Sequence, residues 1–468
     1  MHLLRIALIC STLLCSTLIA QPASAAVLQD QQGRWMGDMK LPNGAQIKFG
    51  VHLFTRADGL PWASVSSPDQ DAFDIPVRRI TESADGIELD LSFATLHMRW
   101  TGEHFEAVNR QGSATIPVTL TKVSQFPSQA RPQTPTGPFP YIEQTLAIES
   151  APGVVLGATL AIPEGKASGM VVVLVHGSGP QTRDAVNFGH RTFAVLSDHL
   201  ARQGIAVLRY DKRGIAYSTG DYERHTLPDL GADLSAVIKA LKSRQQFTRI
   251  GVIGHSEGAE VVARTAAAEP QSADFIVSMA GVGLNGLKAL LVQDRVYALD
   301  KGASAAEADQ LMVYVRKFYA TIIAQADPLA REAALKALIA RQSRQMKAMI
   351  ARHEMNQGTL SLDWAAKPFL RVSLLSDAPA YWRQVRCPVL AISGGLDHQV
   401  PARENLTGLV AAVRAGGNSR IESAVLARLN HAFQSAKTGR EDEYASIDET
   451  ISPAALDKLT DFIHRQGR

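Results

Sequence analysis

The sequence is poor in the features that mark several classes of protein. Only 3 of its 468 residues are cysteine, too few for a framework of disulfide bonds. Lysine and arginine number 48 and aspartate and glutamate 45, so a net charge of +3 gives no strong field to attract nucleic acid or anionic lipid. With 46% hydrophobic and 20% charged residues, the composition excludes wholesale disorder. We expect a globular protein of roughly two to four domains without a nucleic-acid partner.

Long apolar runs are missing beyond the N-terminus. No segment after residue 25 has about 18 consecutive apolar residues, the length that spans a membrane. At the N-terminus, Arg5 precedes the apolar stretch 6–20, and the small residues 23–25 form a signal-peptidase pattern. These features predict a removed signal peptide at 1–25 and an exported protein, periplasmic or secreted; the alternative is a retained N-terminal helix.

Two of the three cysteines lie in this leader. Ile9 precedes Cys10 and Leu14 precedes Cys15, whereas a lipoprotein signal has a small residue before its cysteine, so no lipid anchor is expected. Cys387 then remains alone and cannot form an intramolecular disulfide bond. Because it opens an apolar run, we interpret it as a small hydrophobic residue without chemistry.

The first hundred residues after the leader indicate β-structure. Short alternating runs at 46–53, 87–93 and 96–100 are separated by turn residues. They predict an all-β domain at 26–125, a small sandwich or barrel. Five prolines in the segment 126–140 then predict an extended linker.

From residue 141 onward, apolar strands alternate with amphipathic helices. This pattern predicts an α/β domain at 141–286 and 384–468, with a mostly parallel sheet between helices on both faces. The intervening residues 287–383 show long helical patterns and predict a helical cap insertion. Strands are expected at 169–175, 205–210, 249–254, 275–279, 388–393 and 421–429, and helices at 194–203, 229–243, 259–268, 307–325, 329–352, 404–415 and 453–465.

The strand 249–254 runs directly into a G-x-S-x-G motif that a helix follows. A motif of this kind also occurs by chance, but its place between strand and helix is the setting of a nucleophile elbow. The glycines permit a sharp turn that exposes the serine at a strained tip. We therefore predict Ser256 as the nucleophile; the alternative is a glycine-rich turn with an incidental serine. The elbow residues are Gly254, His255, Ser256, Glu257 and Gly258.

A serine nucleophile needs a general base, which follows it in chain order in such folds. Of the 13 histidines, only His398, His431 and His464 lie far enough downstream. His464 sits inside the terminal helix, and His398 adjoins the candidate acid Asp397. His431 lies in the loop after a predicted strand, which favours it as the base over a plain surface histidine.

The orienting acid should follow a strand at the carboxyl edge of the sheet. Asp397 comes two residues after Gly394-Gly395, just beyond the strand 388–393. Asp377 is a nearby rival, but it precedes that strand. We predict Asp397 as the acid; the alternative is an aspartate that only caps a turn.

An oxyanion hole is expected where the strand 169–175 ends in HGSGP at 176–180. Glycines there allow backbone N–H groups to approach a developing negative charge. Ser178 or Gly179 should supply one amide and Glu257 the other, while His176 braces the loop.

These segments resemble the α/β-hydrolase superfamily and, more narrowly, exported serine carboxylesterases with an extra N-terminal β domain. The resemblance covers most of residues 141–468, and SPDQ at 67–70 is similar to a stretch of that family's β domain. After Arg213-Gly214 the family usually continues with glycine, a short residue and serine, whereas this chain has IAYS at 215–218. The matching segments are HGSGP (176–180), LRYDKRG (208–214), GHSEG (254–258), CPVL (387–390), LNHAFQ (429–434) and EYA (443–445).

The leading hypothesis is a serine carboxylesterase that acts on small-molecule esters with short-to-medium acyl groups. It needs no metal or cofactor, and no H-E-x-x-H spacing supports a zinc mechanism. One alternative is a serine peptidase, acyltransferase or thioesterase with the same triad, because the fold supports many acyl transfers. Another is a non-catalytic binding protein on a hydrolase scaffold, although no triad member is missing. Oligomeric state is left open.

Apolar residues of the predicted cap form either its own core or part of an acyl pocket. The first interpretation is favoured for any one residue, because such stripes at helical spacing usually face a core. The residues concerned are Leu311, Met312, Tyr314, Phe318, Tyr319, Met346, Met349 and Ile350.

Overall fold

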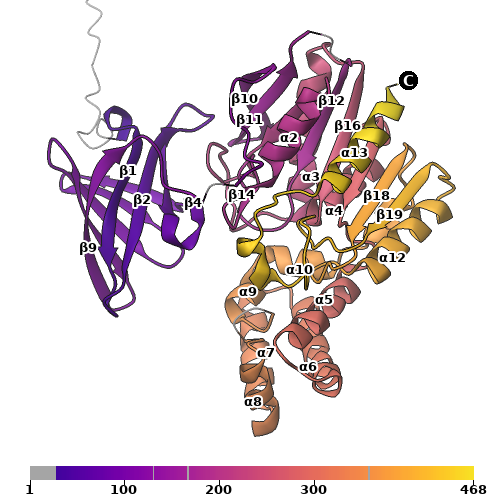
Figure 1. The fold of residues 1–468 in the computed structure, drawn as a ribbon. Coiled ribbons are helices and arrows are strands. Elements are labelled where there is room, and N and C mark those ends of the chain that lie inside the picture. Colours follow the sequence, from indigo (N-terminus) through magenta and orange to yellow (C-terminus); the bar gives the residue numbers. More distant parts are fainter. Residues whose placement is uncertain (1–27, 130, 166–167, 357–358, 468) are drawn as a thin grey trace, which may run out of the picture.

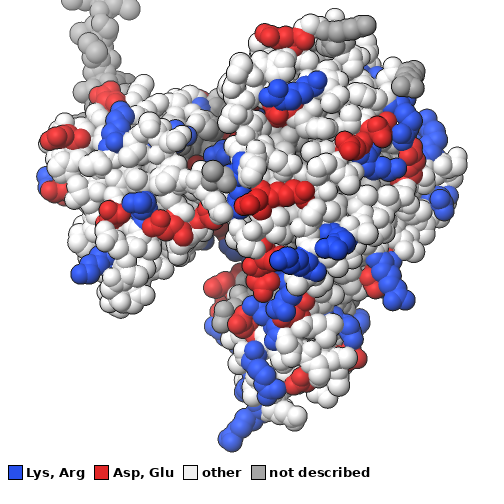
Figure 2. All heavy atoms as spheres, viewed as in Figure 1, with Lys and Arg blue, Asp and Glu red and all other residues white. Residues whose placement is uncertain are grey.

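The computed structural model describes residues 28–129, 131–165, 168–356 and 359–467 (Figure 1). The predicted signal peptide at 1–25 lies outside the described residues and stays a prediction. In the described ranges no helix combines the length and apolarity that crossing a membrane requires. Acidic and basic side chains are interspersed over the face shown in Figure 2, as a net charge near zero leads one to expect.

The N-terminal part is an all-antiparallel sheet of nine strands, which confirms the prediction of an all-β domain. The strands follow the order β4-β3-β2-β1-β9-β8-β7-β6-β5 and enclose a core around Trp35, whose ring contacts Trp100 and Phe105 edge-on. Alternate residues of β8 and β9 are buried, as in a sheet with one solvated face, whereas β2 and β3 are buried over most of their length. The strands are β1 (Gly33–Lys40), β2 (Gln46–Thr55), β3 (Pro61–Ser67), β4 (Ala72–Pro76), β5 (Arg79–Ser83), β6 (Gly86–Asp90), β7 (Thr95–Trp100), β8 (Phe105–Gln111) and β9 (Ala114–Val123).

The second sheet has eight strands in the order β10-β11-β15-β12-β16-β17-β18-β19. The antiparallel strands β10 and β11 form one edge, and the six strands from β15 to β19 run parallel. This arrangement confirms the predicted mostly parallel sheet. The strands are β10 (Tyr141–Ala151), β11 (Val154–Pro163), β12 (Met170–Val175), β15 (Ala206–Tyr210), β16 (Arg249–His255), β17 (Phe275–Met279), β18 (Val389–Gly394) and β19 (Ile421–Leu426).

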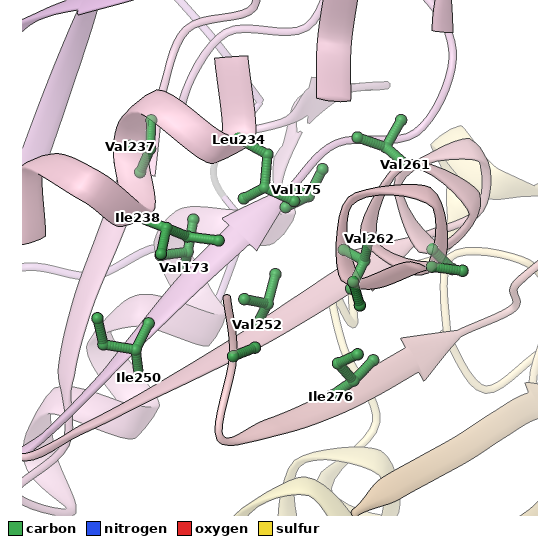
Figure 3. Packing of buried hydrophobic residues seen from close by; sticks show 14 of the residues in the cluster. Val173, Val175, Leu234, Val237, Ile238, Ile250, Val252, Val261, Val262 and Ile276 are labelled. Atoms are coloured by element: carbon green, nitrogen blue, oxygen red, sulfur yellow. The ribbon is translucent and has the colours of Figure 1, made fainter. Parts of the chain in front are cut away.

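Helices cover both faces of this sheet, so its central strands are buried on two sides. All six residues of β12 are buried. Figure 3 shows Val175 of this strand beside Leu234 of α3 and Val173 beside Ile238 of the same helix. One face is covered by α3 (Leu227–Ser243), α4 (Glu257–Ala268) and α12 (Ala402–Ala415), and the other by α2 (Thr192–Arg202) and α13 (Pro453–Gln466).

The described residues between β17 and β18 form seven helices, called here the helical insertion; α5 to α10 share an apolar core of their own, whereas α11 packs into the core of the α/β domain. The prediction of one helix over 329–352 is wrong, because the chain breaks at 341–343. There the hydroxyl of Ser343 accepts a hydrogen bond from the amide of Met346 (3.1 Å) and begins a new helix. The helices are α5 (Gly286–Asp300), α6 (Ala305–Ala324), α7 (Pro328–Ala340), α8 (Arg344–Arg352), α9 (Leu362–Ala366), α10 (Pro368–Leu374) and α11 (Ala378–Trp382).

The β domain contacts the α/β domain through Tyr217. Its ring lies 4.7 Å from the ring of Phe54 and 6.4 Å from that of His52, centroid to centroid. Its carbonyl accepts a hydrogen bond from the amide of Ala57 (2.8 Å). The residues that depart from the family pattern at 215–218 therefore include one that joins the two domains.

The segment between the two domains is more than a spacer. The buried guanidinium of Arg131 donates to the carbonyls of Phe188 (2.8 Å), Ala445 (2.9 Å) and Ile447 (3.0 Å). The side chain of Gln133 donates to the carbonyl of Ile451 (2.8 Å). The predicted linker is thus bound along the surface of the α/β domain.

We expect Tyr217→Ala to loosen the contact between the domains. An aromatic pair contributes about 0.5–1.5 kcal/mol beyond its buried area, which corresponds to about a two- to tenfold change in an equilibrium. The rate of limited proteolysis between residues 124 and 140 should rise by about that factor. Tyr217→Phe keeps the ring and is the matched control; equal protection in all three proteins would contradict the prediction.

Candidate active site

Ser256 occupies the turn between β16 and α4. Its backbone has φ 55° and ψ −122°, a region that costs a non-glycine residue about 1–3 kcal/mol. Its amide donates to the carbonyl of Met279 on the neighbouring strand (2.8 Å), which anchors the turn. The strained turn brings the hydroxyl to the carboxyl edge of the sheet, next to a cavity.

The glycines around Ser256 are required by close backbone contacts. A Cβ atom on Gly258 would lie 2.3 Å from the carbonyl oxygen of Val175, and one on Gly254 would lie 2.5 Å from that of Gly258. Real Cβ atoms do not approach oxygen so closely, so any larger residue would displace α4 from the strands below it. Sequence reasoning thus placed the elbow glycines at positions where the backbone leaves no room.

The ring of His255, the residue before the nucleophile, packs beside the ring of His431. Its ring centroid lies 4.8 Å from that of His431, and its Nε2 lies 3.0 Å from the carbonyl oxygen of His431. Burial lowers the pKa of His255 to about 4. It is therefore uncharged at neutral pH and supports the loop without adding a positive charge.

Asp397 and His431 form a buried pair. Oδ2 of Asp397 lies 2.8 Å from Nδ1 of His431, and Oδ1 accepts from the amides of Gln399 (2.9 Å) and Val400 (2.8 Å). The Asp397 side chain is 0% exposed and that of His431 is 7% exposed. Because a carboxylate only accepts hydrogen bonds, Nδ1 carries a proton, and in the neutral ring Nε2 is left as an acceptor.

The rival residues lie elsewhere. Nδ1 of His398 lies 2.8 Å from Oδ2 of Asp300, so this ring is turned to the helical insertion. Asp377 accepts from the amide of Ala380 (3.3 Å) at the start of α11, and His464 sits on α13. The structure thus brings His431, with Asp397 bound to it, to the cavity that holds Ser256, and leaves the rivals outside the cavity lining.

The expected oxyanion loop lies directly beside the nucleophile. A Cβ atom on Gly177 would lie 3.2 Å from Cβ of Ser256, and Glu257 is the first residue of α4. Within the described residues, the backbone amides of Ser178 and Glu257 donate no hydrogen bond to another backbone group. Gly179 has a φ of 93°, a conformation that glycine adopts without strain and that allows the chain to turn just after Ser178.

His176 sits beneath this loop. Its ring is 5.1 Å from the ring of Phe193 and 5.4 Å from that of Tyr210, centroid to centroid. Burial, with a smaller contribution from Lys212, lowers its pKa to about 3. A neutral, enclosed ring of this kind agrees with the bracing role expected for it.

A cavity of about 430 Å³ opens over Ser256 and His431. Its polar lining includes Gln181, Asn187 and Gln399, and its apolar lining is shared between the helical insertion and the α/β domain, which supplies Phe188, Phe193 and Leu227. The cap residues that could have formed an acyl pocket, such as Phe318 and Met349, lie in the insertion's own core. The apolar lining instead includes Val282, Ala289, Leu290, Trp364, Phe369 and Leu370.

A family model described as Serine aminopeptidase, S33 (Hydrolase_4) matches residues 167–435, more than half of the chain. The chain belongs to this family. It is therefore a serine hydrolase, and the predicted α/β-hydrolase fold is confirmed by the sheet order and by the family.

Individual relatives of this S33 family member are esterases. Esterase EstD of Thermotoga maritima is 32% identical over 143 residues, 31% of this chain and 33% of that protein, so the match spans about a third of the relative's length. The esterase Pf2001 of Pyrococcus furiosus is similar in structure, with a TM-score of 0.41, 17% identity, and coverage of 69% of this chain and 91% of that chain. Est1E of Butyrivibrio proteoclasticus with bound ferulic acid gives a TM-score of 0.42 at 16% identity, covering 69% and 98%.

Sequence reasoning missed the residues of this S33 enzyme that support the histidine loop. The hydroxyl of Tyr444 accepts from the amide of His431 (3.3 Å), and Arg131 holds the carbonyls that follow Tyr444. Tyr444 lies within the EYA segment that carried part of the resemblance, which was its only signal. Arg131 gave none, because two of its three partners, Ala445 and Ile447, are more than 300 positions away in the chain.

Glu260 was also missed. It lies on α4 one turn after Ser256, lines the cavity, and accepts a short hydrogen bond from the hydroxyl of Ser376. Burial raises its pKa to about 7. The cavity wall therefore changes charge near neutral pH.

Within the described part of the chain, no group of three or more His, Cys, Asp or Glu side chains could hold a metal ion.

Proposed function

We propose that the protein is a serine carboxylesterase in which Ser256 is the nucleophile, His431 the general base and Asp397 the orienting acid. The observation that carries the proposal is the buried Asp397–His431 pair, whose histidine lines the cavity that also holds Ser256 at its strained turn. The sequence similarity to Esterase EstD of Thermotoga maritima supports the choice of an ester over an amide substrate.

The mechanism follows from the hydrogen-bond capacities of these groups. Ser256 Oγ attacks the ester carbonyl while Nε2 of His431 takes its proton, and Asp397 stabilises the imidazolium that forms. The amides of Ser178 and Glu257 bind the oxyanion, with Gly179 as the alternative donor to Ser178. The imidazolium then returns the proton to the leaving alcohol, and a water activated by His431 hydrolyses the acyl-enzyme.

The apolar lining supplied by the helical insertion supports short-to-medium acyl groups. Each buried methylene contributes about 0.8 kcal/mol, or about fourfold in kcat/KM, until the pocket is full. We expect kcat/KM for p-nitrophenyl esters to rise with chain length and then to fall. Amino-acid p-nitroanilides, tested in parallel, should be cleaved far more slowly; faster cleavage of these amides would favour an aminopeptidase instead.

Leu290→Trp should shorten the acyl chain that the enzyme accepts. The larger ring fills part of the apolar lining, so kcat/KM for an octanoate ester should fall at least about tenfold while that for an acetate ester changes less than about threefold. Val313→Trp, at a position that is 60% exposed on α6, is the matched control. An unchanged chain-length profile in Leu290→Trp would place the acyl group elsewhere.

A further inference from the structure

Lys212 is a buried lysine that the proposed mechanism does not use. Its side chain is 3% exposed, and Nζ lies 3.0 Å from Oε1 of Glu257, which is itself 7% exposed. The same Nζ donates to the carbonyl of Gly177 (2.8 Å). One ammonium group therefore contacts both segments that flank the expected oxyanion position.

A second link joins the same segments. The hydroxyl of Ser178 donates to Oε2 of Glu257 (2.9 Å), so both carboxylate oxygens of Glu257 are occupied. Ser178 and Glu257 are also the residues whose amides are expected to bind the oxyanion. Their side chains are thus connected to each other, while no acceptor in the part of the chain that the structure describes is bound to their backbone amides.

From these contacts we propose that Lys212 is a positioning residue that sets the separation of the two oxyanion-hole amides. The proposal rests on the proposed acyl-transfer function. Oxyanion donors act only at about 2.7–3.1 Å from the oxyanion, and the loss of one donor costs about 10²–10³ in kcat. A partial displacement of both amides should therefore cost about 10–100-fold.

Stability alone does not account for the pair. Burying two charges costs several kcal/mol each in desolvation, and apolar side chains of similar volume often serve the fold as well or better. An ammonium group, in contrast, reaches a carbonyl and a carboxylate at once. It also places a positive charge, buried from solvent, against the peptide group that joins Gly177 to Ser178.

The backbone that carries Lys212 is held firmly on both sides. The amide of Lys212 donates to the carbonyl of Gln181 (3.1 Å), and the carboxylate of Asp211 binds the guanidinium of Arg183 (2.6 Å). The ring of Tyr217, five residues further along the chain, packs against the ring of Phe54 in the β domain. The ammonium group thus projects from a fixed base, as a positioning residue requires.

The test compares Lys212→Met with the double variant Lys212→Met/Glu257→Gln. The single variant leaves a buried carboxylate without its partner, so it should lose thermal stability; the double variant removes that charge and should recover it. Both variants should show kcat lowered about 10–100-fold with KM within about threefold of wild type. Lys242→Met is the matched control, because Lys242 also donates to a carbonyl, that of Gln271 (2.7 Å), but is exposed on α3.

The rate constant for labelling of Ser256 by a fluorophosphonate is the second measurement. Phosphonylation also develops negative charge on an oxygen in the oxyanion hole, so it should slow by a similar factor in both variants. Wild-type kcat and labelling rate in the double variant would overturn the proposal, and so would failure of both variants to fold, which would assign the pair to stability. If the wild-type enzyme hydrolyses no ester, the proposed function fails, while the labelling rates still test Lys212.

Discussion

Ser256→Ala should lower the hydrolysis of an activated ester by about 10⁴-fold or more and abolish labelling by a fluorophosphonate. Members of a catalytic triad act as a unit, so the remaining groups cannot replace the nucleophile. Alanine meets the same positive φ as serine and keeps the hydrogen bond from its backbone amide to the carbonyl of Met279, so the fold should be retained. The measurements are kcat/KM on one p-nitrophenyl ester, labelling followed by mass spectrometry, and the thermal midpoint.

Ser178→Ala is the matched control for this experiment. It removes a hydroxyl next to the same cavity but keeps the backbone amide expected to bind the oxyanion. Labelling of Ser256 should persist in this variant, with a rate lowered much less than in Ser256→Ala. Labelling of another serine in Ser256→Ala would refute the assignment of the nucleophile.

Features that depend on neighbouring residues could be predicted from the sequence. The elbow is specified by five consecutive residues, and the steric need for Gly254 and Gly258 is a local consequence of the tight strand-to-helix turn. The parallel strands were found because strands buried on both faces give continuous apolar runs, as in β12. Asp397 and His431 could be proposed as acid and base because both follow Ser256 in the chain and each comes just after a predicted strand.

Features that depend on contacts between distant segments could not be predicted. Lys212 belongs to a motif that carried the resemblance, but its contacts with Gly177 and Glu257 exist only after three parallel strands align. Arg131 lies in a segment whose proline content indicates a spacer, and its role comes from loops more than 300 positions away. The break between α7 and α8 was missed because one capping hydroxyl, that of Ser343, outweighs a helical pattern that continues through it.

Asp397→Asn should lower kcat by up to about 10⁴-fold with little change in shape. Oδ1 of Asp397 accepts from the amides of Gln399 and Val400, so the oxygen of an asparagine would stay there. Its NH₂ group would then face Nδ1 of His431 and donate to it. The histidine would be forced to carry its proton on Nε2, the wrong tautomer for accepting the proton of Ser256.

The same experiment distinguishes the two histidines near this acid. His431→Ala should abolish turnover to a similar degree, whereas His398→Ala should cost far less, because the His398 ring is bound to Asp300 and turned to the helical insertion. All variants are measured on one activated ester, with folding checked by circular dichroism. Near-normal turnover in His431→Ala together with collapse in His398→Ala would transfer the role of the base to His398. The Asp397–His431 pair would then be a structural hydrogen bond, and Asp397→Asn, which preserves most of that bonding, should leave kcat nearly unchanged.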